Sequence, residues 1–240
     1  MRRFEAITLD LWDTLVQEVP RKNPGLADQR IADIQENLRS IGRAYETADM
    51  KRAYRLSGEF CESVWAENRD MPVDEHLGYM LYALDPGLAG SLKAEEYRRI
   101  KRIYSEAILG RPPVLMEGAL ATLKALSAKG YRMGIVSNTG RTPGVVLRTA
   151  LARIGIDRFF GCMIFSDEVL VRKPEKEIFF EALGWLNAPP ERTVHVGNDR
   201  KDDFDGARAA GMNSILLDRS GKVERGGEVV HSLTEIVDLL

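Results

Sequence analysis

The chain is poor in cysteine and histidine, and each shortage excludes a class of protein. Its 240 residues contain only two cysteines, Cys61 and Cys162, which lie far apart without CxxC spacing. A fold held together by disulfides is therefore excluded, and a reducing compartment, the cytoplasm, is expected. The three histidines, His76, His195 and His231, are scattered along the chain, which excludes a zinc site built from histidines.

The chain also lacks a long uncharged apolar run and a strong charge of either sign. Glu5 and Asp10 interrupt the apolar stretch that follows Arg2 and Arg3, so this pattern fits neither a signal peptide nor a membrane span. The net charge is −2, which offers no basic surface for nucleic acid or an anionic membrane. We therefore expect a small-molecule substrate as partner, no nucleic acid, no membrane, and a monomer or homodimer.

What the sequence does contain is short apolar runs that end in polar residues, alternating with helical patterns. Such runs predict strands at 6–9, 131–136, 163–165, 193–197 and 214–217. Helical periodicity predicts helices at 26–41, 47–68 and 74–84, and a fourth capped by Ser91. Alternating strands and helices after residue 111 predict a mostly parallel sheet with helices on both faces. Connecting loops are expected at 20–25 and 219–228.

Polar residues stand where the predicted strands end. Asp10, Ser137 and the pair Asn198–Asp199 each follow an apolar strand, and Lys173 precedes a predicted helix. The carboxyl ends of parallel strands meet at one edge of the sheet, where open α/β folds bind ligands. The sequence therefore predicts one crevice that holds a carboxylate nucleophile, a hydroxyl, an ammonium group and further acidic groups.

In these stretches the chain resembles the haloacid dehalogenase (HAD) superfamily of hydrolases. The matching segments, in the order of the family's four motifs, are Asp10–Thr14 (DLWDT), Ser137 in VSNTG, Lys173-Pro174, and Gly197–Asp203 followed by Gly206–Met212. The resemblance implies a three-layer, Rossmann-like α/β core with a parallel sheet, formed by 1–17 and 111–240. It also implies an inserted all-helical cap domain at 18–110.

The resemblance also assigns roles to residues. In family phosphatases the first aspartate, here Asp10, attacks phosphorus and forms an aspartyl-phosphate, which splits one hard step into two. Lys173 would keep Asp10 ionised, and Thr14, Ser137 and Asn138 would bind substrate.

The expected cofactor is Mg²⁺, which prefers oxygen ligands and retains water. The ligands implied are the carboxylate of Asp10, the backbone carbonyl of Trp12, Asn198 and Asp203.

Two departures from the family pattern leave the chemistry open. Trp12 stands where family phosphatases carry the aspartate that protonates the leaving group, a contribution of about 10²–10⁴-fold. Asn198 replaces the first acidic metal ligand, and Asp199 or Asp203 could compensate for the lost charge. Both departures resemble the dehalogenase branch, which works without metal, whereas the acidic turn at 199–203 favours a metal-dependent phosphatase. A Mg²⁺-dependent phosphatase is the favoured hypothesis, a 2-haloacid dehalogenase the second, and a catalytically weak binding relative the third.

Overall fold

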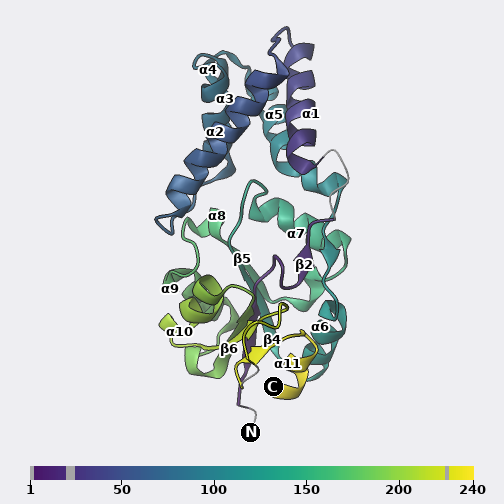
Figure 1. The fold of residues 1–240 in the computed structure, drawn as a ribbon, viewed down its shortest axis with the longest axis vertical. Coiled ribbons are helices and arrows are strands. Elements are labelled where there is room, and N and C mark those ends of the chain that lie inside the picture. The colour runs from purple at the N-terminus through teal and green to yellow at the C-terminus, as the bar shows by residue number, and fades with distance from the viewer. Residues whose placement is uncertain (1–2, 20–24, 225–226) are drawn as a thin grey trace.

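The computed structural model describes residues 3–19, 25–224 and 227–240. Most of the predicted connector at 20–25, and residues 225–226 of the predicted loop, lie outside the described residues. Figure 1 shows a sheet flanked by helices, with a group of further helices at one end. None of the described helices combines the length and apolarity that crossing a membrane requires.

The described residues form a six-stranded sheet in which every pairing is parallel. Its strand order is β5-β4-β1-β6-β7-β8, so β1 lies inside the sheet between β4 and β6. Leu9 at the end of β1 is in register with Ile135 and Val196. The strands are β1 Ala6–Leu9, β4 Arg132–Ser137, β5 Cys162–Phe165, β6 Thr193–Gly197, β7 Asn213–Leu217 and β8 Val229–Val230.

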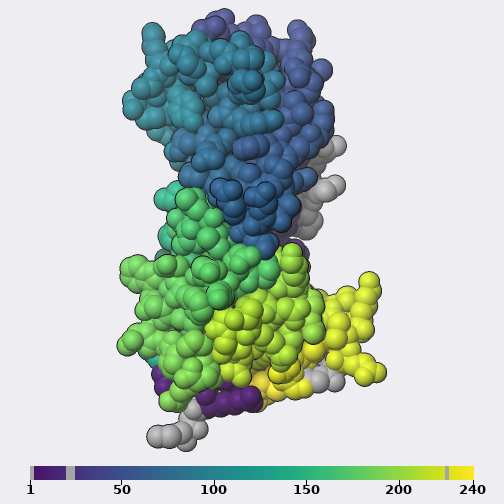
Figure 2. Space-filling view, turned by 90° about the vertical axis from the view of Figure 1, so that its left-hand side faces the viewer, coloured from purple at the N-terminus to yellow at the C-terminus, as the bar shows by residue number. Residues whose placement is uncertain are grey.

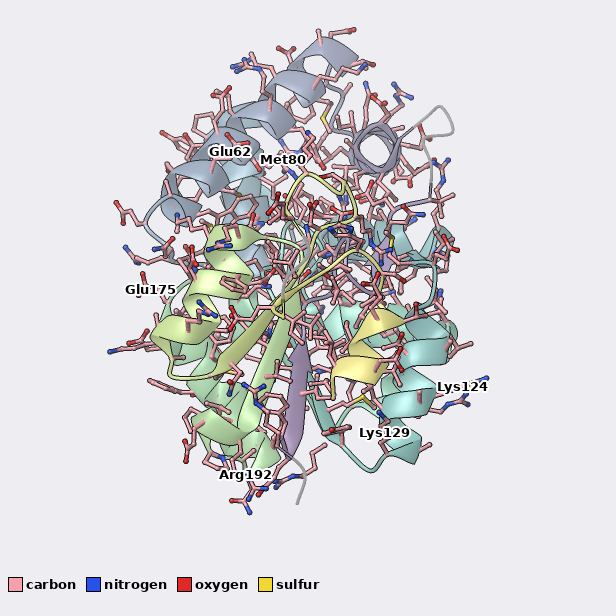
Figure 3. The ribbon with its side chains drawn as sticks, turned by 60° about the horizontal axis from the view of Figure 1, so that its bottom comes forward. Glu62, Met80, Lys124, Lys129, Glu175 and Arg192 are labelled. Atoms are coloured by element: carbon pink, nitrogen blue, oxygen red, sulfur yellow. The ribbon has the colours of Figure 1, made fainter. Side chains whose placement is uncertain are left out.

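Helices cover both faces of this sheet because its central strands are apolar on both sides. On one face the cluster that contains Ile7, Leu9 and Ile135 packs against α6 (Ala119–Ala128), α7 (Gly144–Arg153) and α11 (Glu235–Leu239). On the other, Ala6 and Val136 pack against α9 (Lys176–Leu186) and α10 (Gly206–Ala209). Figure 3 places Lys124 and Lys129 on the α6 side of the sheet and Glu175 on the α9 side. The predicted three-layer α/β architecture is confirmed.

The remaining large helices form what we call the helical lobe, α1 to α5. Apolar side chains from several of its helices, including Ile34, Met50, Leu77 and Tyr104, form a buried cluster of their own. Figures 1 and 2 show the lobe at one end of the molecule, and Figure 1 shows it above the carboxyl ends of the strands. The lobe helices are α1 Leu26–Ser40, α2 Thr47–Trp65, α3 Val73–Leu84, α4 Leu88–Ser91 and α5 Ala94–Glu106.

Local structure differs from the sequence prediction at a few places. The predicted cap Ser91 is wrong, because Ser91 ends the short helix α4 and its hydroxyl donates to the Leu88 carbonyl at 2.8 Å. Helix α5 instead begins after Lys93, whose backbone N–H donates to the Glu96 carboxylate at 2.8 Å. The patterns did not predict β8 or a small antiparallel ladder of β2 (Val16–Gln17) and β3 (Val114–Leu115).

The short elements complete the described chain. They are α8 Ser166–Val169, the 3₁₀ turns Ala107–Gly110, Asp157–Phe159 and Pro190–Arg192, and the π-helical turn Arg200–Asp205.

Candidate active site

Asp10 lies directly after the central strand β1, at the edge of the sheet that faces the lobe. Its backbone N–H donates to the Val196 carbonyl at 2.9 Å, which extends the pairing with β6 by one residue. The chain then turns sharply: Asp13 has φ 55° and its N–H donates to the Val16 carbonyl at 2.8 Å. Asp10 is 6% exposed, so its carboxylate is held at the strand end and largely shielded from water.

Lys173 brings two distant carboxylates together. Its Nζ lies 2.6 Å from Oδ1 of Asp10 and 2.6 Å from Oδ1 of Asp203. All three side chains are buried, and the contacts span 163 and 30 residues of sequence. The predicted meeting of the first, third and fourth polar stretches is therefore present in the structure.

Asp203 is anchored on every side by the core. Its Oδ1 also accepts from Nε2 of His195 at 3.1 Å, and its Oδ2 accepts from the backbone N–H of Asp199 at 2.9 Å. His195 in turn contacts the Thr8 hydroxyl through Nδ1 at 2.8 Å. A Cβ at Gly197 would stand 2.2 Å from Asp203, so only glycine lets this carboxylate lie against β6.

Burial and charge oppose each other in this group. Burial raises the pKa of Asp10 to about 6, although the Lys173 ammonium pulls in the other direction. Burial also disfavours the charge on Lys173 and on Asp203. The attraction of Asp10 and Asp203 outweighs burial at Lys173, so its pKa lies above its ordinary value. The attraction of Lys173, with the contacts of His195, outweighs burial at Asp203, so its pKa lies well below its ordinary value. Burial lowers the pKa of His195, so the neutral ring donates from Nε2 to the ionised Asp203 and accepts from Thr8 at Nδ1.

Asn138 and Ser137 lie next to Lys173. The Asn138 side chain accepts from the backbone N–H of Lys173 at 2.8 Å and donates to its carbonyl at 3.1 Å, so it fixes the backbone of the lysine. It also donates to Asp202 at 3.1 Å. Ser137 is fully buried, and its hydroxyl donates to the Asn138 carbonyl at 3.3 Å. The binding roles expected of both residues stay predictions.

The predicted metal ligands can be compared with what Mg²⁺ requires. Among residues 3–19, 25–224 and 227–240, no three His, Cys, Asp or Glu side chains gather as a metal cluster. Mg²⁺, however, commonly takes only one or two protein carboxylates, and water and substrate phosphate complete its shell. Asp10 supplies one carboxylate. Asn198 is exposed, and its amide oxygen accepts from the Thr14 hydroxyl at 3.0 Å. These donors fit Mg²⁺ in kind, whereas the contacts of Asp203 favour its role as the anchor of Lys173.

Sequence reasoning missed a buried carboxylate that joins the lobe to the core. Asp70, between α2 and α3, accepts from Arg172 at 2.7 Å and from the Ser166 hydroxyl at 2.5 Å. Its other oxygen accepts from Trp65 Nε1 at 2.9 Å. The only signal in the sequence for this contact was the position of Arg172, the partner of Asp70, directly before Lys173.

A cavity of about 450 Å³ lies between the lobe and the core. Trp12 and Asn138 form the wall on the side of Asp10 and Lys173, and three arginines that the motifs did not single out complete much of the lining: Arg30, Arg141 and Arg172. A second hollow, of about 750 Å³, lies between α1 and α5 and contains none of the residues that the motifs predicted.

Comparisons with known proteins agree with this geometry. Residues 4–211 match the family model of the haloacid dehalogenase-like hydrolases. A "Phosphorylated carbohydrates phosphatase" of Thermotoga maritima is 26% identical over 99% of this chain and 98% of its own length. A "Glyceraldehyde 3-phosphate phosphatase" of Methanothermobacter thermautotrophicus is 37% identical over 50% of this chain, and the match spans about half (56%) of that relative.

Solved structures show the same fold. A 2-haloacid dehalogenase from Pseudomonas syringae superposes with a TM-score of 0.70 at 19% identity, covering 98% of this chain and 97% of that chain. A HAD phosphatase from Thermococcus onnurineus gives a TM-score of 0.61 at 22% identity, with the same coverage of 98% and 97%. With the match to the family model, these findings establish that the chain belongs to the haloacid dehalogenase-like hydrolases.

Proposed function

We propose that this hydrolase is a Mg²⁺-dependent phosphatase that acts on a small phosphorylated metabolite through an aspartyl-phosphate at Asp10. The observation that carries the proposal is the position of the Lys173 ammonium, 2.6 Å from both Asp10 and Asp203 in the crevice at the strand ends. The names of the Thermotoga and Methanothermobacter relatives, both phosphatases of small phosphorylated compounds, support the same substrate class.

In the proposed reaction an Asp10 oxygen attacks phosphorus, and the bond from phosphorus to the leaving oxygen breaks. The Lys173 ammonium holds Asp10 ionised and offsets the charge on the phosphoryl oxygens, together with Ser137 and Asn138. Water then attacks the acyl phosphate, which releases inorganic phosphate and regenerates the carboxylate.

The proposed holders of Mg²⁺ are the Asp10 carboxylate, the Trp12 carbonyl and Asn198. When bound, the ion would supply positive charge against the phosphate and against the crowded carboxylates.

Trp12 narrows the range of substrates that this site should process well. It is half-buried beside Asp10, and an indole can neither give nor take a proton at the position where family phosphatases carry an acid. The leaving group must then depart without strong general-acid help, a loss of about 10²–10⁴-fold for a poor leaving group. We therefore expect acyl and aryl phosphates to be cleaved faster than simple alkyl phosphates.

We propose the domain division expected from the sequence, with the core at 1–17 and 111–240 and a cap at 18–110. The separate apolar cluster of the helical lobe supports it. The lobe would then cover the strand ends and help to select the substrate.

The experiment is a panel of acyl, aryl and alkyl phosphates assayed with Mg²⁺ and with chelator. Turnover that requires Mg²⁺, that Asp10→Asn abolishes and that Asp205→Asn preserves would support the proposal. Asp205 is an exposed carboxylate at the end of the π-helical turn Arg200–Asp205 and serves as the control. Acid-quenched enzyme should carry a phosphoryl group on the peptide that contains Asp10. Absence of metal-dependent turnover on the whole panel would contradict the proposal.

A second candidate, a 2-haloacid dehalogenase, is favoured by Trp12 and Asn198 together. Halide leaves as an anion without a proton, and an amide in place of a carboxylate suits a site without metal. Release of halide from 2-chloropropionate that is insensitive to chelator would support this candidate. If Asp10→Asn changes no activity but ligand binding persists, the chain is a binding relative.

A further inference from the structure

Two arginines cross between the helical lobe and the core in opposite directions. Arg30, on α1 of the lobe, donates to the hydroxyl of Thr142 in the core at 2.7 Å. Arg141, in the core loop after β4, reaches into the lobe and donates to the Ser57 hydroxyl at 3.0 Å and the Tyr54 carbonyl at 2.8 Å. Both arginines line the same cavity, and both donate to Tyr54 and Tyr104.

Neither of these guanidinium groups has a negative partner among the described residues. Arg30 also donates to the Tyr104 carbonyl and the Tyr54 hydroxyl, and Arg141 also donates to the Tyr104 hydroxyl. All of these acceptors are neutral. Arg141 also lies 3.8 Å from the centre of the Tyr54 ring. Removing a charge from water is strongly unfavourable unless an opposite charge compensates it. With Arg30 only 6% exposed, the cavity carries positive charge that the protein itself does not offset.

The third arginine of the cavity, Arg172, differs from these two because a carboxylate compensates its charge. Arg172 forms an ion pair with Asp70 at 2.7 Å and lies 4.5 Å from the Trp65 ring. Besides this pair, the described lining of the cavity includes a single carboxylate, the exposed Glu18. The excess charge is therefore concentrated at Arg30 and Arg141.

The lobe is shaped to admit Arg141. A Cβ at Gly58, within α2, would lie 2.6 Å from Nη2 of Arg141, so the guanidinium occupies space that any other residue would fill. A glycine inside a helix makes the helix less stable than an alanine would at the same position. The helix thus contains a less stable residue at the position where this charge enters.

Two residues of the cavity lining are close neighbours of the proposed site of chemistry. Trp12 lies two residues after Asp10, and Asn138, which holds the backbone of Lys173, lines the same wall. Its volume of about 450 Å³ lies within the range of sites for small molecules. A substrate bound with its phosphoryl group at Asp10 would place its leaving group in this cavity.

We propose that Arg30 and Arg141 bind a second acidic group, a carboxylate or a second phosphate, on the leaving group of the substrate. This inference rests on the proposed phosphatase function and narrows its substrates to small phosphomonoesters that carry a further anion. The planar guanidinium suits both groups, because it donates two parallel hydrogen bonds to a carboxylate or a phosphate.

The first test compares matched ligands on the full-length protein. For a carboxylate, 3-phosphoglycerate is compared with glycerol 3-phosphate, and for a second phosphate, fructose 1,6-bisphosphate is compared with fructose 6-phosphate. Affinity is measured by calorimetry on Asp10→Asn, which cannot turn over, in the presence of Mg²⁺. We expect the doubly acidic member of at least one pair to bind at least about tenfold more tightly. Equal affinity within both pairs would overturn the inference, whatever the activity of the wild type.

The second test removes the charge. Arg30→Met and Arg141→Met should each lower kcat/KM for the doubly acidic substrate about tenfold more than for its partner, so the preference collapses. Arg39→Met is the matched control, because Arg39 lies on the same helix, exposed and paired with Glu36 at 2.9 Å. A preference that survives both arginine variants would overturn the assignment to these residues. The first test measures ligand binding to Asp10→Asn and uses no arginine variant. It therefore remains decisive even if Arg30→Met folds poorly. Phosphatase activity with no preference would contradict this inference alone, without touching the proposed function.

Discussion

The crevice around Lys173 and the arginine cavity beside it treat charge in opposite ways. In the crevice, the ammonium lies 2.6 Å from each of two carboxylates, and a buried histidine completes the group. In the cavity, Arg30 and Arg141 are held only by carbonyl and hydroxyl oxygens. The charges in the crevice are therefore paired with opposite charges before any ligand binds. In the cavity the side chains are held in position, but the positive charges of Arg30 and Arg141 have no such partner among the described residues.

This difference in charge compensation suggests different roles for the two regions, one in the reaction step and the other in ligand recognition. A preorganised arrangement of charges suits a reaction step, because the groups need not reorganise when the reaction occurs. An uncompensated charge suits recognition, because a site built to contact an anion discriminates strongly against a ligand that lacks it. Four substitutions would break or sharpen this contrast.

The largest effect is expected at Lys173. Lys173→Met leaves Asp10 and Asp203 buried without their shared cation, and breaking a buried ion pair in this way costs about 3–5 kcal/mol. Under the proposed mechanism, turnover should fall by about 10²-fold or more, because the charge that would offset the phosphoryl oxygens is lost. Urea unfolding and steady-state kinetics measure the two effects. Lys176→Met, three residues away and exposed, should change stability by no more than about 0.5 kcal/mol. Equal losses in both variants would refute the pairing.

The next largest effect is expected at Asp70. Asp70→Asn would leave Arg172 as uncompensated as Arg30 and Arg141, at a cost of about 3 kcal/mol in the free energy of unfolding. Asp74→Asn is the control, since Asp74 is half-exposed and its pair with Lys101 should contribute no more than about 1 kcal/mol. Unfolding curves in urea compare the two. A destabilisation of Asp70→Asn no larger than that of Asp74→Asn would show that the junction does not depend on this carboxylate.

An effect of similar size, visible only in acid, is expected at His76. Burial lowers the pKa of His76 to about 4, and Arg141 and Arg172 add to this against the opposing field of Asp70. Between pH 6.5 and 4 the unfolded chain then binds a proton that the folded chain does not, so stability falls as the pH falls. The loss from this group is on the order of 3 kcal/mol across that interval. His76→Leu should remove it, so we expect a shallower decline of stability from pH 6.5 to 4, measured by urea unfolding. Parallel declines in the two proteins would contradict this.

The smallest effect is expected at Gly58. Gly58→Ala adds a Cβ that must displace the Arg141 guanidinium, while the helix gains up to about 1 kcal/mol of propensity. Stability should therefore change little, whereas the preference for doubly acidic ligands falls a few-fold in calorimetry. Gly78→Ala, on α3 with nothing within 4 Å, should stabilise the protein without changing the preference. An unchanged preference in Gly58→Ala would show that Arg141 adjusts freely.

The sequence predicted the core well because its signals are local. Apolar strands such as β1 and β6 are buried on both faces, so their composition alone marks them, and parallel pairing then brings Asp10 and Asp203 to one edge. The arginines could not be predicted in the same way. Helical periodicity places Arg30 on α1 but does not say which core loop that face meets, and Arg141 follows a motif without belonging to it. The core residues that donate to Asp70 lie 69 to 102 residues away in sequence, so local patterns could not reveal them.

One short pairing of backbones joins the α2–α3 loop to the segment just before Lys173. The Asp70 N–H donates to the Leu170 carbonyl at 3.1 Å, and the Arg172 N–H donates to the Asn68 carbonyl at 2.9 Å, around an antiparallel bridge between Arg69 and Val171. Because main-chain atoms form these hydrogen bonds, ordinary side-chain substitutions leave them in place. Only proline at position 70 or 172 would remove one of the N–H donors. Any movement of the lobe relative to the core would therefore either break this backbone pairing or pivot about it. If the lobe pivots there, its movement would displace the segment of chain that carries Lys173.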